Sequence, residues 1–162
     1  MCLPSEAELL RSLRHELRVL DPDILTGWDL VSDTLLPLKQ RFDACNLPFN
    51  LGRSDRLSRI TAPAPGRRGR AQAIIEGRQL LDAKDTARAG QRRFDDLDLP
   101  TVSDDVLKRV PRTASERARA ILDILRADNL IQLTLQRSLL IGIPLQRSWT
   151  SVGAFDFLYL SE

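Results

Sequence analysis

An α/β domain is the fold class that this sequence predicts, and three features carry the prediction. A helical repeat of leucines follows a capping box at 5–8, near the start of the chain. The short apolar run 24–26 lies between a proline and a glycine, which is typical of a buried strand. Beyond residue 84, helical patterns with recognisable caps dominate, so the second half should be rich in helices. The order helix, strand, helix, strands and helices is that of an α/β arrangement.

The first helix is expected to run from a cap at Ser5 to about residue 20. Its leucines recur at steps of three and four residues, and Asp21–Pro22–Asp23 ends the pattern because proline cannot continue the hydrogen-bond ladder. After the strand at 24–26, a second helix is expected over Asp33–Cys45, with Pro37 in its first turn. The stripe of the first helix comprises Leu9, Leu10, Leu13, Leu17 and Leu20, and the inner face of the second comprises Leu35, Leu38, Phe42 and Cys45.

The middle of the chain is expected to form loops and short strands. Residues 46–59 contain loop and short extended pieces. Residues 61–70 are rich in proline, glycine and arginine, which is typical of a flexible loop, either a hairpin tip or a linker. Two short strands are expected near 72–75 and 79–82, and a weak helix near Lys84.

Three further helices are expected in the second half. The first covers 102–110, with Ser103 as its cap. The second follows a capping box at Thr113–Glu116. The third starts at a cap on Asp128 and ends at Gly142, because glycine readily adopts the left-handed conformation of a helix end. The residues of the second of these helices that should face inward are Ala118, Ile121, Leu122 and Leu125.

The composition excludes several classes of protein. A net charge of +2 is too small to indicate nucleic-acid binding by itself. No apolar run approaches the roughly 20 residues that span a bilayer, so no membrane association is expected. No signal peptide is visible, and Cys2 and Cys45 are expected to be free thiols, so we expect a cytoplasmic protein.

The sequence contains no recognisable metal or cofactor site. Neither a phosphate-binding glycine loop nor a GxSxG nucleophile elbow occurs. His15, the only histidine, lies among charged residues and is expected to be solvated. The adjacent pairs Asp95–Asp96 and Asp104–Asp105 are expected in loops or helix caps rather than on a metal ion. We therefore expect neither a bound metal nor a cofactor.

Arg67, Arg68 and Arg70 form a small basic cluster beside proline and glycine. Arginine forks contact phosphates well, so the cluster is a candidate for nucleic-acid contact. No aromatic side chain is interleaved with it for stacking on bases, and a solvated loop is the alternative interpretation.

Several segments together resemble family B DNA polymerases, most closely the bacterial polymerase II branch. Ser5–Leu10 through Asp21–Trp28 is similar to the helix and strand that lead into the family's second exonuclease motif. Leu47–Arg53 and Gly77–Asp82 are similar to later parts of the same domain. The most specific stretches, similar to the exit from that domain, are Arg137–Ser138, Gly142–Arg147 and Ser151–Leu160.

The resemblance implies a ribonuclease H-like proofreading domain, in which carboxylates from three motifs hold two metal ions that activate water. The first motif, Asp-x-Glu, occurs nowhere in the chain. At the second, Asp29 replaces an asparagine, Asp33 a phenylalanine and Thr34 the metal-binding aspartate. At the third, Thr113 takes the place of a tyrosine and Arg117 that of an aspartate, and an arginine would repel the metal. All five are therefore expected to be vestigial motif positions without a catalytic role.

The leading hypothesis is a truncated ribonuclease H-like exonuclease fold that lacks the first antiparallel strands and is catalytically inactive. Residues 1–150 would form this domain, and 151–162 would begin the segment leading to a missing polymerase region. The strand at Ile24 would have an open edge, and either the residues after Leu57 fill it, or a polymerase or another protein chain completes the sheet, or the fold is marginally stable. A structural role, or binding of DNA or a partner in replication or repair, would follow. Mg²⁺ would be needed only if activity is retained.

Two other functions stay open. The chain would be an enzyme component if it is one piece of a split or multi-chain DNA polymerase, and a neighbouring reading frame with Asp-x-Glu would favour this. It would instead be a small arginine-rich nucleic-acid-binding module if salt-dependent binding disappears when Arg67, Arg68 and Arg70 are neutralised.

Overall fold

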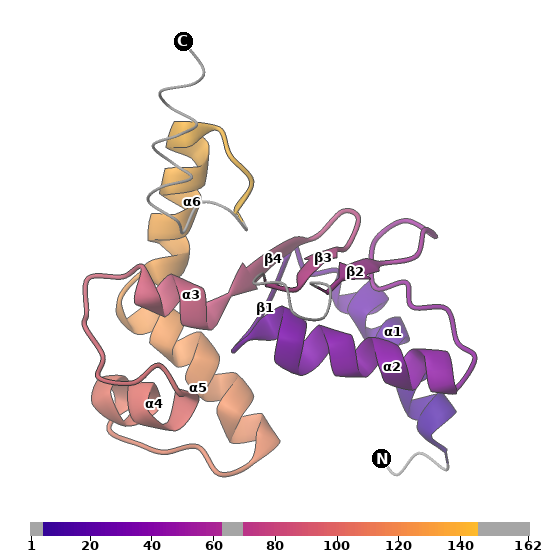
Figure 1. Ribbon diagram of the computed structural model, residues 1–162, viewed down its shortest axis with the longest axis horizontal. Helices are drawn as coiled ribbons and strands as arrows, with labels where there is room; N and C mark the ends of the chain where they lie inside the picture. Colours follow the sequence, from indigo (N-terminus) through magenta and orange to yellow (C-terminus); the bar gives the residue numbers. More distant parts are fainter. Residues whose placement is uncertain (1–4, 63–69, 146–162) are drawn as a thin grey trace. The chain divides into compact units, whose positions relative to one another are not determined.

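The computed structural model describes residues 5–62 and 70–145, which form helices and two small sheets (Figure 1). The α/β class and the helix-rich second half are confirmed. The chain divides into two compact units, a first unit of Met1–Leu25 with Leu30–Leu80 and a second unit of Thr26–Asp29 with Leu81–Glu162. The elements in chain order are α1 (Glu6–Leu20), β1 (Ile24–Gly27), the π-helix η1 (Leu30–Leu35), α2 (Leu36–Ala44), β2 (Arg59–Thr61), β3 (Gln72–Ile74), β4 (Gln79–Asp82), α3 (Ala83–Arg88), α4 (Leu99–Leu107), α5 (Ala114–Ala127) and α6 (Leu130–Ile141).

Each sheet has two strands in the part of the chain that the structure describes. β1 pairs with β4, and β2 pairs with β3 in antiparallel fashion. The strands expected near 72–75 and 79–82 are confirmed, whereas the sequence pattern does not predict β2. The expectation of a flexible loop over 61–70 falls mostly on 63–69, which lie outside the described residues. β4, which comes after Leu57, is a partner strand for β1 within this chain. The ribonuclease H-like arrangement and completion of the sheet by another chain stay predictions.

Helix α1 begins where the capping pattern predicts, but it buries only part of its leucine stripe. The Ser5 hydroxyl accepts a hydrogen bond from a backbone N–H of the first turn at 3.3 Å, and the helix ends at Asp21, whose φ of 41° is left-handed. Leu10 is buried, whereas Leu9 and Leu20 are 55% and 72% exposed. At about 3.6 residues per turn, Leu9 and Leu20 lie beside the line of Leu10 rather than on it.

The second helix starts earlier than predicted and begins as a π-helical turn. η1 starts at Leu30 and passes into α2 at Leu36, with Pro37 in the first turn of α2, so the expected start at Asp33 is wrong. Hydrogen bonds in a π-helix link residues five apart, and Leu30 and Leu35, which are so spaced, are both buried. Burial of both leucines in the core favours a helix that begins at Leu30, three residues before the predicted start.

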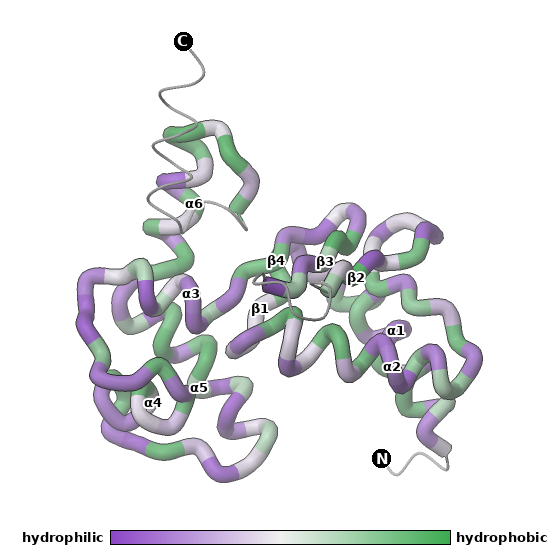
Figure 2. The backbone as a smooth tube through the Cα atoms, in the orientation of Figure 1, coloured by the Kyte–Doolittle hydropathy of each residue, from purple (hydrophilic) through white to green (hydrophobic). Residues whose placement is uncertain are grey.

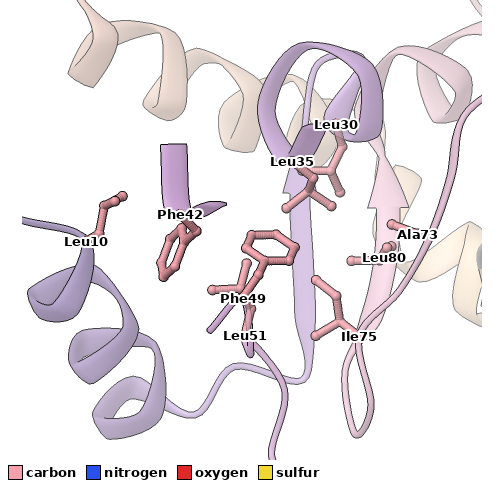
Figure 3. Close-up of a cluster of buried hydrophobic side chains, with 9 residues drawn as sticks. All are labelled: Leu10, Leu30, Leu35, Phe42, Phe49, Leu51, Ala73, Ile75 and Leu80. Carbon is pink, nitrogen blue, oxygen red and sulfur yellow. The ribbon is translucent and has the colours of Figure 1, made fainter. Parts of the chain in front are cut away.

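The core of the first unit lies between α1, η1, α2 and the adjoining strands (Figure 3). The Phe42 ring is fully buried and meets Phe49 edge-on, with ring centroids 5.4 Å apart. The predicted inner face of the second helix is confirmed, because Leu35 and Phe42 are buried and Leu38 and Cys45 are partly buried against the same cluster. The buried members of the cluster are Leu10, Leu30, Leu35, Phe42, Phe49, Leu51, Ala73, Ile75 and Leu80.

Helix α4 starts before its predicted cap. Asp98 occupies the cap position and Pro100 lies in the first turn, so the expected helix over 102–110 is displaced. Ser103 is fully buried within the helix, where its hydroxyl donates to the Arg109 carbonyl at 2.7 Å. The prediction is wrong because a proline in the first turn fixes φ for helix entry, and this signal outweighs a serine three residues later.

The two last helices confirm two of the three predicted end signals. The capping box that opens α5 has both reciprocal hydrogen bonds, and Gly142 closes α6 with a φ of 75°. Asp128 does not cap α6, because Asn129 takes the cap position with a left-handed φ of 52°. On α5, Leu125 is buried and Ile121 is partly buried as predicted, whereas Ala118 and Leu122 are exposed and Ala120 and Ile124 are buried in their place.

No helix within 5–62 or 70–145 is long and apolar enough to cross a membrane.

Replacing Thr26 with valine is expected to raise the free energy of unfolding by about 1 kcal/mol. The Thr26 hydroxyl of β1 is buried without a hydrogen-bond partner among the described residues, so it loses water on folding and gains nothing. Urea unfolding of the two proteins measures the change.

Thr86→Val is the matched control for this prediction. The Thr86 hydroxyl is also buried, but it donates to the Asp82 carbonyl at 2.6 Å, so its loss should lower stability. An equal loss of stability in Thr26→Val and Thr86→Val would contradict the assignment of Thr26 as unsatisfied.

Candidate functional site

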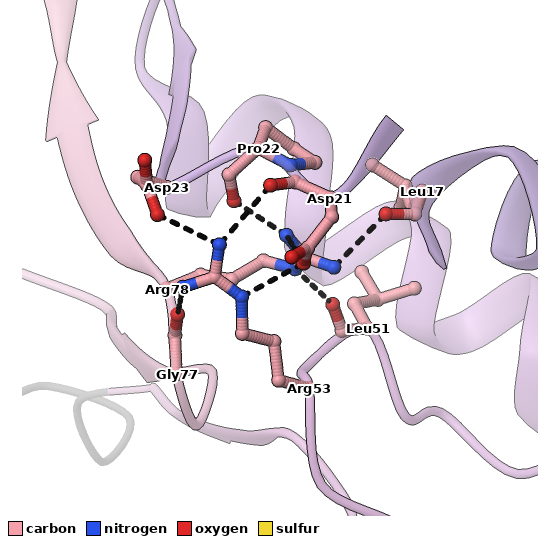
Figure 4. A network of polar contacts seen from close by, with 8 residues as sticks. All are labelled: Leu17, Asp21, Pro22, Asp23, Leu51, Arg53, Gly77 and Arg78. Carbon is pink, nitrogen blue, oxygen red and sulfur yellow. Dashed lines mark hydrogen bonds and ion pairs between the residues drawn. The ribbon is translucent and has the colours of Figure 1, made fainter. Parts of the chain in front are cut away.

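The Asp21–Pro22–Asp23 corner is held by Arg53, which reaches it from the loop after α2 (Figure 4). The Arg53 guanidinium donates to the carboxylates of Asp21 and Asp23, each at 2.7 Å. It also donates to the Gly77 carbonyl at 2.8 Å and to the Asp21 carbonyl at 3.1 Å. One planar fork thus ties the exit of α1 to the turn that precedes β4.

A second arginine, Arg78, lies beneath this corner with a side chain that has no exposed surface. Its guanidinium donates to the carbonyls of Leu51 and Leu17, both at 2.9 Å, and to the carbonyl of Pro22. The nearest carboxylate, that of Asp21, lies 3.1 Å away. A buried cation is tolerated only when its hydrogens are satisfied, and here three carbonyls and one carboxylate surround it.

The charges of the corner reinforce one another. The hydrogen bond from Arg53 is the largest cause that lowers the pKa of Asp21, and the positive charges of Arg53 and Arg78 act in the same direction against desolvation. Hydrogen bonds to Asp21 and then to Asp23 raise the pKa of Arg53 further above its ordinary value. Both shifts favour the ionised forms of Asp21 and Arg53, whose contacts join the end of α1 to Arg53 and the turn before β4.

Trp28 and Asp29 follow this corner in the sequence and belong to the second unit, where both make structural contacts. The Trp28 indole N–H donates to the Leu97 carbonyl at 3.0 Å, and its ring packs on the cores around α3, α4 and α5. Asp29 has a left-handed φ of 50°, and its carboxylate accepts from the Lys84 ammonium at 2.6 Å. Asp29 is thus bound to a cation of α3.

The other vestigial motif positions lie in both units. Asp33 and Thr34 are exposed on η1 in the first unit. In the second unit, Thr113 caps α5 by accepting from the Glu116 N–H at 3.2 Å, and Arg117 is exposed in the first turn of that helix. Their interpretation as vestigial positions stays a prediction.

Metal-ligating side chains do not gather in the described part of the chain. No three histidine, cysteine, aspartate or glutamate side chains within 5–62 and 70–145 lie close enough together to hold an ion.

The basic cluster predicted to contact nucleic acid lies mostly outside the described residues. Arg67 and Arg68 fall within 63–69, and Arg70 is exposed at the edge of the described hairpin. Nucleic-acid contact by these three residues stays a prediction.

Sequence reasoning missed Arg53 and Arg78, the residues with the most polar contacts at this corner. Both follow a glycine, at Gly52–Arg53 and Gly77–Arg78, and both act on acids more than 20 residues away in the chain. The available signal was the pair of carboxylates at Asp21 and Asp23, because two adjacent acids beside a helix end need a cation.

The comparisons with known proteins give one finding. No family model matches this chain. The chain is similar to DNA polymerase II of Escherichia coli (strain K12), with 24% identity over 180 aligned residues. The similarity covers 96% of this chain and 23% of that polymerase, so the chain spans less than a quarter of the length of this relative. It supports a polymerase-like relationship in general.

Proposed function

We propose that this chain is an exonuclease-like domain of family B polymerase type that acts in DNA replication or repair by binding, without cleaving phosphodiester bonds. The similarity to DNA polymerase II along nearly the whole chain supports the link to DNA. The contrast between Asp21 and Asp29–Thr34 carries the proposal. Asp21 has the contacts that a folded corner needs, whereas in the next segment Asp29 is paired with Lys84 and Thr34 stands where the family has a metal-binding aspartate.

The side chains at three of the vestigial positions support the proposal that the chain does not cleave phosphodiester bonds. Divalent metal ions of phosphodiester hydrolysis need oxygen ligands with negative charge. Thr34 offers a neutral hydroxyl and Arg117 a cation at positions where the family has carboxylates. The carboxylate of Asp29 is neutralised by the Lys84 ammonium at 2.6 Å, and a metal ion would have to displace that contact.

Purified protein is expected to leave single-stranded DNA intact with either Mg²⁺ or Mn²⁺, because no cluster of three metal-ligating side chains forms within 5–62 and 70–145 to hold the ions that activate water. A labelled oligonucleotide is incubated with the chain and each metal, and its length is followed on a denaturing gel. The expected result is no shortening beyond that seen without protein.

Two variants separate intrinsic cleavage from contamination. Asp33→Ala removes the exposed carboxylate nearest to the second motif, and Asp43→Ala removes an exposed carboxylate of α2 that pairs with Lys39 at 2.5 Å. Metal-dependent cleavage that persists equally in both variants does not depend on Asp33, and it leaves the proposal standing only if it separates from the chain on further chromatography. Cleavage that is lost only in Asp33→Ala refutes it.

A further inference from the structure

The charged residues of the second unit are segregated along the chain. Residues 81–145 have a net charge of only +1, yet 94–107 contains five aspartates and no cation, while 108–126 contains six cations and two carboxylates. Figure 2 shows that the loop leading into α5 is largely hydrophilic. The cations of this basic segment are Lys108, Arg109, Arg112, Arg117, Arg119 and Arg126.

Three of these arginines lie on or beside the outer face of α5. Ile124 and Leu125 are buried and define the inner face of the helix. Arg119 and Arg126 are exposed and seven residues apart, so they lie almost in line on the opposite side, about 10.5 Å apart at 1.5 Å per residue. Arg112 is exposed immediately before the cap of the helix.

Both carboxylates of the basic segment are already engaged. The Glu116 carboxylate accepts from the backbone N–H groups of Arg112 and Thr113 at 2.7 and 3.1 Å, and these bonds lower the pKa of Glu116. The Asp123 carboxylate accepts from the Arg109 guanidinium. Within the described residues, no ion pair is formed by Arg119, and the only one of Arg126 is a 3.9 Å contact with Asp123. The outer face therefore keeps unneutralised positive charge.

We propose that the outer face of α5, through Arg112, Arg119 and Arg126, binds the phosphodiester backbone of nucleic acid without reading its sequence. Arginine forks suit phosphate oxygens, and Arg119 and Arg126, about 10.5 Å apart along the helix, can contact separate phosphates of one strand. α5 has no aromatic side chain that would stack on bases, so the contact is electrostatic. The proposal deepens the DNA-related function above and assigns it a surface.

The test compares binding of a labelled 20-nucleotide duplex and its single strand by the full chain and by Arg112→Gln/Arg119→Gln/Arg126→Gln. Glutamine keeps helix propensity and removes charge. We expect the triple variant to bind at least tenfold more weakly, and the slope of log affinity against log salt to fall by about 2 to 3. Circular dichroism of both proteins verifies that the variant is folded.

Two controls make the location testable. Arg11→Gln/Arg56→Gln/Arg93→Gln removes the same charge from exposed sites elsewhere, and it should retain most of the affinity and the slope. Arg67→Gln/Arg68→Gln/Arg70→Gln tests the basic cluster predicted from sequence. The proposal is overturned if the α5 variant binds like the parent, if all three variants lose the same affinity, or if only the 67–70 variant loses binding. None of these outcomes bears on cleavage, which the nuclease assay decides separately.

Discussion

Arg78→Met is expected to lower the free energy of unfolding by about 3 kcal/mol, a large part of the stability of a small protein. Arg78 has no exposed side-chain surface, and its guanidinium serves three carbonyls from three parts of the chain. Methionine fills a similar volume but donates nothing. The carbonyls of Leu17, Pro22 and Leu51 would then stay buried without this donor.

Urea unfolding at pH 7 measures this loss, and two further variants identify its cause. Arg78→Lys keeps the charge but offers one compact ammonium in place of a planar fork, so it should recover only part of the stability. Arg56→Met removes an 80% exposed arginine that pairs with Glu76 at 3.3 Å, and it should leave the unfolding midpoint nearly unchanged. Equal midpoints for Arg78→Met and Arg56→Met would show that the buried network contributes little.

The elements with local signals are those that the sequence predicts well. The caps at Ser5 and Thr113 and the glycine at the end of α6 each depend on residues within one helical turn. They are confirmed because the hydrogen-bond partners lie three or four positions away. Ser103 shows the limit of this reasoning, since its hydroxyl finds a carbonyl six residues on and its burial is decided by packing.

The leucine stripe of α1 was informative about helix formation and less so about burial. The periodicity predicts a helix, and one forms over Glu6–Leu20. How wide a strip of that helix is covered depends on which other elements reach it, and Leu9 and Leu20 are not covered. The spacing of leucines along the sequence does not indicate how much of the helix surface other elements will cover.

The sequence predicts which residues occupy the motif positions of the candidate site, but it does not predict their contacts. Asp29, Asp33 and Thr34 follow from comparison of the chain with a motif, and their side-chain types are read from the sequence. The ion pair of Asp29 with Lys84 joins residues 55 positions apart, and the contacts of Arg78 span up to 61. Such pairings depend on the path of the whole chain, so one sequence without its fold does not reveal them.

The contacts of the Asp21–Pro22–Asp23 corner do not depend on the residues at the motif positions. Asp21 and Asp23 serve folding through Arg53 and Arg78, and these contacts involve none of the five vestigial motif positions. Substitutions at the motif positions therefore leave the corner network untouched. A folded domain that binds without cleaving is consistent with that independence.

Gly52→Ala is expected to destabilise the first unit by about 2 to 3 kcal/mol, because a backbone group occupies the place of the new methyl group. A Cβ on Gly52 would lie 2.5 Å from the Glu76 carbonyl oxygen and 3.2 Å from the Glu76 nitrogen. The same carbonyl accepts from the Arg53 N–H at 2.9 Å, so it cannot retreat without weakening that bond. Displacing Glu76 would also move Gly77 and Arg78, which follow it directly.

The effect of the substitution on the unfolded state opposes the expected loss of stability. Alanine restricts the unfolded chain more than glycine does, which by itself would stabilise the protein by about 0.4 to 1 kcal/mol, so any measured loss understates the clash. Gly90→Ala is the matched control, since its Cβ would meet the Ala87 carbonyl and a flexible Leu130 methyl, both at 3.1 Å. Urea unfolding of both variants should show a clear loss for Gly52→Ala and a change within about 1 kcal/mol for Gly90→Ala. A Gly52→Ala protein as stable as the parent would mean that the Gly52–Glu76 approach is looser than these distances indicate, and that the Arg53 and Arg78 network tolerates movement of the turn that holds it.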